Sequence, residues 1–257
     1  MLKNMMKYGR IKGLLSVSGL HEHRGCLSMI KVILWDIDGT LLDFLAAERA
    51  AINSCFAHFG LGECTDEMLK SYSVINIKYW EALERGEMTK PQILVGRFRE
   101  FFEKYNLDTE LAQAFNAEYQ VRLGDTIVFH KNALETVKAL QGKVLQCVVT
   151  NGTKIAQDKK LRNSGLGDLM DHIFISEVLG IEKPGKLFFD KVFEVIGEYQ
   201  TDEVMIVGDS LTSDIRGGNN AGILTCWYNP LSKENNIDEK VDIEIDDISQ
   251  VLEIIKK

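Results

Sequence analysis

The stretch from Lys31 to Leu42, KVILWDIDGTLL, constrains the fold of this chain most strongly. Its residues Val32 to Trp35 form a short apolar run, which is typical of a strand buried on both faces of a parallel sheet. We expect Asp36 to be the last residue of this strand, and Gly39 to allow a sharp turn after it. Ligands of open α/β sheets bind beyond the carboxyl ends of the strands, so Asp36 and Asp38 stand where a reaction site would lie. Taken alone, these residues also suit an ordinary solvated Asp-Gly turn.

Three later stretches have the same form, an apolar strand followed by polar residues. The strands are expected at 144–149, 172–176 and 204–207. If they lie parallel to the first, their polar ends converge on one edge of the sheet. The predicted site then combines carboxylates with a hydroxyl, an amide and one ammonium. The polar residues are Thr150 and Asn151 after the strand at 144–149, Lys183 after the strand at 172–176, and Asp209 and Asp214 after the strand at 204–207.

The arrangement of helices divides the chain. From residue 132 onward, strands alternate with helices, which predicts a parallel sheet with helices on both faces. Residues 43–125 instead show only helical spacing, which predicts four helices near 46–59, 65–86, 89–105 and 108–123. The helices of the alternating part are expected at 132–140, 154–163, 186–196, 214–220 and 248–255, with a further strand at 223–227.

The order DxDGT, TN, KP and GDxxxxD resembles the four motifs of the haloacid dehalogenase-like hydrolase superfamily. The stretches WEALERGEMTKPQILVGRF, ISEVLGIEKP and GGNNAGILTCW are similar to the pyrimidine 5′-nucleotidase branch of that superfamily. The resemblance implies a Rossmann-like three-layer α/β core with a parallel sheet, formed by residues 29–43 and 126–257. It also implies a small α-helical cap, residues 44–125, inserted after the first core strand.

The residues suit the chemistry of phosphate esters. A carboxylate that attacks phosphorus divides the hydrolysis into two steps through an aspartyl-phosphate. Asp36 is the candidate nucleophile, and Asp38 suits a general acid that later acts as a base. Oxygen ligands together with a phosphate partner indicate Mg²⁺ as the cofactor.

The resemblance implies a role for each remaining polar residue. Alone, these residues have simpler interpretations, since TN is common in turns, a lysine before proline is usually solvated, and two aspartates can cap a helix. The implied metal ligands are Asp36, the main-chain carbonyl of Asp38, and Asp209, with Asp214 as a ligand or close by. Thr150 and Asn151 would hydrogen-bond the phosphoryl oxygens, and Lys183 would supply a positive charge.

Three residues of the predicted cap are candidates for substrate selection. Tyr79 and Trp80 could stack on a nucleobase, and Arg97 could bond to one. The alternative interpretation is that the aromatic residues form the core of the cap. Arg97 fits that alternative less well, because the core of a helical bundle has little use for a guanidinium.

Composition narrows the classes of partner. A formal net charge of −8 argues against a nucleic-acid polymer as partner, because polyanion binding relies on clustered Lys and Arg. The five cysteines are scattered and form no CxxC pair, so we expect a reducing cytoplasm. No run is long and apolar enough to predict a membrane span. Residues 1–28 are expected to be a poorly ordered N-terminal extension. The sequence indicates no oligomeric state.

These observations leave three hypotheses for function. The first is a Mg²⁺-dependent phosphatase that hydrolyses nucleoside 5′-monophosphates, with pyrimidines such as UMP, dUMP and dTMP preferred. The second is a phosphatase of the same fold that acts on a sugar phosphate or phosphoglycolate, or a phosphomutase. The third is a catalytically idle binding protein, which is disfavoured because Asp36, Asp38, Lys183 and Asp209 are all present.

Overall fold

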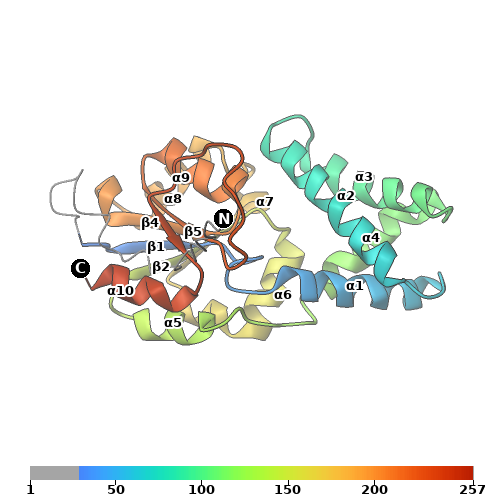
Figure 1. Ribbon diagram of the computed structural model, residues 1–257, viewed down its shortest axis with the longest axis horizontal. Coiled ribbons are helices and arrows are strands. Elements are labelled where there is room, and N and C mark those ends of the chain that lie inside the picture. The colour runs from blue at the N-terminus through green and yellow to red at the C-terminus, as the bar shows by residue number, and fades with distance from the viewer. Residues whose placement is uncertain (1–28, 257) are drawn as a thin grey trace, which may run out of the picture.

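The computed structural model describes residues 29–256, and the predicted N-terminal extension lies outside them. Figure 1 shows an α/β part built around a central sheet, with helices α1 to α4 gathered to one side of it. Within residues 29–256, no helix combines the length and the apolar character that crossing a bilayer requires.

The sheet has six strands, which are parallel in every pairing, in the order β3-β2-β1-β4-β5-β6. The predicted α/β class with a parallel sheet is therefore confirmed. β1 lies in the interior of the sheet, where Trp35 stands opposite Val148 of β2 and Val207 of β4. The strands are β1 (Val32–Trp35), β2 (Leu145–Thr150), β3 (His172–Ile175), β4 (Val204–Gly208), β5 (Leu224–Tyr228) and β6 (Ile243–Ile245).

Helices cover both faces of the sheet because both faces of β1 are apolar. Val32 and Leu34 face one hydrophobic cluster, which includes residues of α8, whereas Ile33 and Trp35 face another, which includes residues of α5 and α10. All four side chains are fully buried, because successive side chains of a strand point to opposite faces and helices cover both faces here. The helices of this part are α5 (Ala133–Leu140), α6 (Lys154–Ser164), α7 (Ser176–Leu179), α8 (Lys186–Ile196), α9 (Arg216–Ala221) and α10 (Val251–Ile255).

Helices α1 to α4 have a hydrophobic core of their own, rich in aromatic rings. Phe98 and Phe115 lie at its centre, with their ring centroids 5.0 Å apart. The first helix begins where the Asp43 side chain accepts a hydrogen bond from the amide of Ala46, and it ends at Gly60 in the left-handed conformation. The four helices are α1 (Phe44–Phe59), α2 (Asp66–Glu84), α3 (Lys90–Lys104) and α4 (Ala112–Arg122).

Some predicted boundaries were wrong. β1 ends at Trp35, although the amide of Asp36 still donates a hydrogen bond to the carbonyl oxygen of Val207 at 3.0 Å. The expected strand 172–176 ends one residue early, because Ser176 begins the short helix α7. Asp214 lies in a π-helical turn, Leu211–Ile215, that precedes α9. Strand β6 was not predicted, because three residues are too few to show a period of two.

Candidate active site

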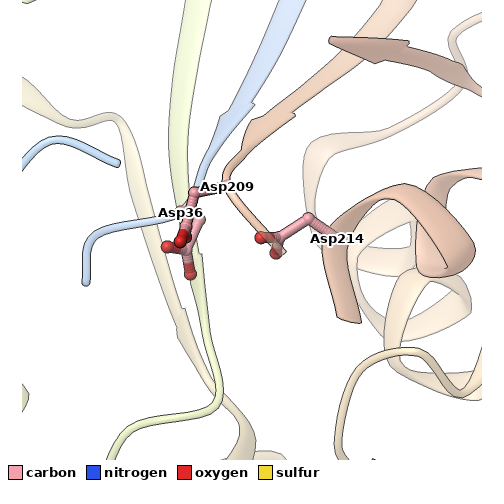
Figure 2. A group of neighbouring side chains, drawn as sticks. All are labelled: Asp36, Asp209 and Asp214. Carbon is pink, nitrogen blue, oxygen red and sulfur yellow. The ribbon is translucent and has the colours of Figure 1, made fainter. Parts of the chain in front are cut away.

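The carboxyl ends of three neighbouring strands build the site. Because β1 lies between β2 and β4, Asp36 follows β1 at the same sheet edge where Thr150 ends β2 and Asp209 follows β4. Figure 2 shows the side chains of Asp36, Asp209 and Asp214 gathered at this edge. The structure therefore brings together residues that are more than 100 positions apart in the sequence.

Lys183 links two of these carboxylates. Its Nζ atom donates to Oδ1 of Asp36 at 3.0 Å, to Oδ1 of Asp214 at 2.6 Å and to the carbonyl oxygen of Val149 at 2.8 Å. The side chain is 1% exposed. Burial alone would lower the pKa of Lys183, but the charges of Asp214 and Asp36 outweigh it and raise that pKa. Lys183 is thus a permanent positive charge beside Asp36.

The three carboxylates crowd one another. Asp36, Asp209 and Asp214 each place an oxygen within 4.8 Å of the others. Burial raises the pKa of Asp36 well above its usual range; Lys183 opposes the rise, and the charges of Asp214 and Asp209 add to it. Burial and the charge of Asp214 raise the pKa of Asp209 to about 7. Three ionised carboxylates would therefore place more negative charge here than Lys183 alone offsets.

This donor set fits Mg²⁺. The group offers carboxylate oxygens from separate elements within the reach of one ion, and Mg²⁺ prefers oxygen ligands of this kind. A divalent cation would also offset the excess negative charge of the cluster.

Thr40 and Gly39 shape the contact between β1 and β4, and our sequence predictions gave Thr40 no role. Its hydroxyl donates to Oδ2 of Asp36 at 3.1 Å and accepts from the amide of Asp209 at 3.1 Å. Gly39 has a φ of +97°, and a Cβ there would lie 2.7 Å from Oδ2 of Asp209. A signal for both residues was available, since they belong to the same DIDGT stretch as Asp36.

Asp38 lies apart from the carboxylate cluster. Its Oδ2 accepts a hydrogen bond from Nε2 of Gln157 at 2.6 Å, and its Oδ1 pairs with the ammonium of Lys160. Gln157 and Lys160 are both buried and stand three residues apart, on one face of α6. The sequence predictions missed Gln157 and Lys160, because a helical pattern does not show which residues the buried face of the helix contacts.

Thr150 and Asn151 have different surroundings. The side-chain amide of Asn151 accepts from the amide of Lys183 at 2.9 Å and donates to the carbonyl oxygen of Lys183 at 2.8 Å. The same nitrogen also donates to Oγ of Ser213 at 3.3 Å. In this conformation Asn151 positions Lys183, and a bond to a phosphoryl oxygen would require Asn151 to give up one of its two donated hydrogen bonds. The hydroxyl of Thr150 accepts from the amide of Gly152 at 3.0 Å and is free to donate its own hydrogen.

Of the three predicted cap residues, Trp80 and Arg97 lie side by side and Tyr79 lies apart from them. Arg97 is 1% exposed, and its guanidinium carbon lies 5.8 Å from the centroid of the half-buried Trp80 ring. Tyr79 instead lines a surface cavity of about 730 Å³, formed by α2, α3 and the turn between them. None of the predicted phosphate or metal residues lines that cavity.

Comparison with known proteins decides the family. The sequence matches the family described as haloacid dehalogenase-like hydrolase over residues 30–222. The chain belongs to this family. The match covers all four motif positions, so the resemblance expected from their order is confirmed.

Several named relatives of this hydrolase cover most of its length. It is 37% identical to YfnB of Bacillus subtilis, named as a HAD-hydrolase, over 80% of this chain and 86% of that protein. It is 32% identical to PynA of Streptococcus pneumoniae, a pyrimidine 5′-nucleotidase, over 88% of this chain and 95% of that protein. YjjG of Escherichia coli, also a pyrimidine 5′-nucleotidase, is 32% identical to it over 79% of this chain and 87% of that protein. The predicted similarity to pyrimidine nucleotidases is therefore confirmed.

A crystal structure of YfnB bound to magnesium has the same fold. It superposes on this hydrolase with a TM-score of 0.84 at 33% identity, over 90% of this chain and 100% of that chain. That structure is described as revealing interdomain movement.

Proposed function

We propose that this hydrolase is a Mg²⁺-dependent phosphatase of nucleoside 5′-monophosphates that prefers pyrimidines such as UMP, dUMP and dTMP. The observation that carries the proposal is the position of Lys183, whose Nζ lies 3.0 Å from Oδ1 of Asp36 within a cluster of three carboxylates. The similarity to two pyrimidine 5′-nucleotidases supports the choice of substrate.

Asp36 is the proposed nucleophile. One of its carboxylate oxygens forms a bond to phosphorus as the bond from phosphorus to the ester oxygen breaks. The ammonium of Lys183 favours the ionised form of Asp36 and opposes the effect of burial, and a bound Mg²⁺ would add to this stabilisation of the carboxylate. The hydroxyl of Thr150, at the same sheet edge, is a donor for a phosphoryl oxygen. The product of this step is an aspartyl-phosphate.

Asp38 is the proposed proton carrier. It gives a proton to the leaving ester oxygen, and then takes a proton from the water that attacks the phosphorus of the aspartyl-phosphate. The contacts with Gln157 and Lys160 hold the Asp38 carboxylate away from the other three carboxylates.

Asp36, Asp209 and Asp214 are the side chains that would hold Mg²⁺, with the main-chain carbonyl of Asp38 as a further proposed ligand. When bound, Mg²⁺ would screen the anionic substrate from these carboxylates and stabilise charge on the phosphoryl group. Helices α1 to α4, within residues 44–125, are proposed to act as a cap that excludes water and selects the leaving group. We also propose a cytoplasmic location, because the four cysteines of residues 29–256 are buried free thiols.

Release of inorganic phosphate from a substrate panel tests this proposal. The panel contains UMP, dUMP, dTMP, CMP, AMP and several sugar phosphates, each with Mg²⁺ and with EDTA. We expect release from UMP, dUMP and dTMP to exceed release from AMP and from the sugar phosphates, and to stop in EDTA. A preference for sugar phosphates would contradict the proposed substrate, but it would be consistent with the proposed mechanism. Absence of release from every ester would contradict the proposed phosphatase activity.

A further inference from the structure

A chain of buried polar side chains runs through α1 to α4, and no step of the proposed reaction uses it. Arg97 of α3 is its centre. Its Nη1 donates to Oδ1 of Asn76 at 2.6 Å, and its Nη2 donates to Oδ1 of Asn116 at 3.3 Å. Arg97 lies among aromatic rings, with its guanidinium carbon 5.1 Å from the centroid of Phe98 and 5.3 Å from that of Tyr119. A charged group buried among aromatic rings costs free energy unless it is paired or hydrogen-bonded.

Arg97 fixes the orientation of both asparagines. A guanidinium only donates hydrogen bonds, so each asparagine must face it with its oxygen. The nitrogen of Asn76 then donates to Oε2 of Glu48 at 2.8 Å, so both the oxygen and the nitrogen of that amide have a partner. Oδ1 of Asn116 also accepts from Nε2 of Gln120 at 3.1 Å, so both of its neighbours hold the same oxygen.

Asn116 is therefore left with an unused donor. Within residues 29–256, Nδ2 of Asn116 has no hydrogen-bond partner, and the side chain is half-buried rather than enclosed. Arg97 also has a buried Nε atom without a partner. Both free groups are donors, so a ligand that meets them must present acceptors.

The chain of side chains reaches the reaction site through Gln120. Oε1 of Gln120 accepts from the hydroxyl of Thr153 at 2.7 Å, and Thr153 directly precedes α6, three residues after Thr150. Helix α6 also carries Gln157 and Lys160, the partners of Asp38. Asn116 thus stands one side chain, that of Gln120, away from the loop that follows β2. The partly exposed ring of Trp80 stands beside Arg97 and offers a surface for stacking.

We propose that Asn116 selects the leaving group, by donating a hydrogen bond from Nδ2 to the 4-carbonyl oxygen of a pyrimidine base that stacks on Trp80. This inference rests on the proposed nucleotidase function. It predicts that bases with a carbonyl at the 4-position, uracil and thymine, are preferred over cytosine. Cytosine has an amino group at this position, so two hydrogen-bond donors, that amino group and Nδ2 of Asn116, would face each other. Arg97 is a positioning residue in this scheme, since it holds Asn116 with the donor outward.

Asn116→Asp tests the proposal with little change of shape. The carboxylate keeps the oxygen that accepts from Arg97 and Gln120 and replaces the free donor with an acceptor. We expect the ratio of kcat/KM for UMP to that for CMP to fall by about tenfold, the value of one hydrogen bond. Gln113→Glu, the same chemical change on an exposed residue of α4, is expected to leave the ratio unchanged. Turnover of p-nitrophenyl phosphate reports whether each variant is folded.

The outcomes separate this proposal from the function on which it rests. A wild-type enzyme that cleaves UMP, with the same UMP to CMP ratio in Asn116→Asp, would overturn the role of Asn116 alone. If Asn116→Asp does not fold, Asn116→Ala replaces it, and the ratio is again expected to fall towards one. A wild-type enzyme that cleaves p-nitrophenyl phosphate but no nucleotide would overturn both the nucleotidase function and this role.

Discussion

The ammonium of Lys183 lies 3.0 Å from Oδ1 of Asp36, and both side chains are buried. The contact joins the loop before α8 to the end of β1, so the positive charge is in place before any substrate binds. Its second carboxylate partner, Asp214, lies 2.6 Å away. A buried charge that loses its partner is strongly destabilising, so this ammonium supports the fold as well as the chemistry.

Lys183→Met is expected to reduce both stability and activity. At pH 8 it leaves the Asp36 and Asp214 carboxylates buried without their cation, and we expect a loss of about 3 kcal/mol in the free energy of unfolding. At pH 5 the loss is expected to be smaller, because protonation removes part of the buried negative charge. Phosphate release is expected to fall by at least about a hundredfold. Urea unfolding at both pH values measures the effect.

The control for this prediction is Lys31→Met. Lys31 lies just before β1 and pairs with Glu203 at 2.5 Å, but its side chain is 53% exposed. We expect its removal to leave stability and phosphate release close to wild type. Equal losses in the two variants would contradict the role assigned to Lys183.

Mg²⁺ is expected to bind through Asp209. In wild type, EDTA should abolish phosphate release, and added Mg²⁺ should restore it and raise the Tm. Asp209→Asn is expected to raise the half-saturating Mg²⁺ concentration by at least about tenfold, because it removes a charged ligand. Asp66→Asn, at an exposed carboxylate of α2, serves as the control. Unchanged Mg²⁺ dependence in Asp209→Asn would show that the ion binds elsewhere.

Glu84 is expected to make stability depend on pH. Burial raises the pKa of Glu84 to about 7, although the hydroxyl of Thr212, which donates to its Oε2 at 2.5 Å, opposes the rise. In the unfolded chain this pKa is about 4.3. The folded protein therefore binds the proton more tightly, so the stability that Glu84 contributes is present at low pH and is lost as the pH rises through about 7.

Glu84→Gln isolates this contribution, because it keeps the shape and removes the titration. We expect the variant to lose less stability than wild type between pH 5 and pH 8, as measured by urea unfolding in EDTA. Parallel pH profiles for the two proteins would argue against a raised pKa at Glu84.

Asp38→Asn is expected to separate the two halves of the reaction. With p-nitrophenyl phosphate the leaving group needs no proton, so the first step should proceed, whereas water still needs a base for the second. We therefore expect a burst of about one equivalent of p-nitrophenol followed by slow turnover. With UMP both steps need Asp38, and no burst of uridine is expected. Steady turnover of both esters at the wild-type rate would exclude Asp38 as the proton carrier.

The central residues of the site could be predicted from the sequence, because one repeated pattern, an apolar strand followed by polar residues, determines where they lie. Four apolar strands with polar ends are enough to predict a parallel sheet whose carboxyl edge gathers Asp36, Lys183, Asp209 and Asp214. The composition of β1 also predicts its burial on both faces, since every residue from Val32 to Trp35 is apolar. Such inferences need only the direction of each strand.

The remaining parts depend on tertiary contacts that no local pattern shows. Lys160 looks like a solvated helical lysine, yet it is 1% exposed and pairs with Asp38. Asn151 was expected to bond to a phosphoryl oxygen, and no local pattern shows that its side-chain amide also pairs with the main chain of Lys183. Tyr79 and Arg97 were grouped because both belong to the predicted cap and could contact a nucleobase, and the packing of α2 against α3 separates them.

The rate of phosphate release by Asp36→Asn tests the central claim most directly. The substitution keeps the size of the side chain and removes the charged oxygen that is proposed to attack phosphorus. With Mg²⁺ and UMP, and with folding verified by thermal melting, we predict a loss of at least about a thousandfold in kcat. A rate within about tenfold of wild type would contradict covalent catalysis by Asp36, because the effect of one missing hydrogen bond would explain it.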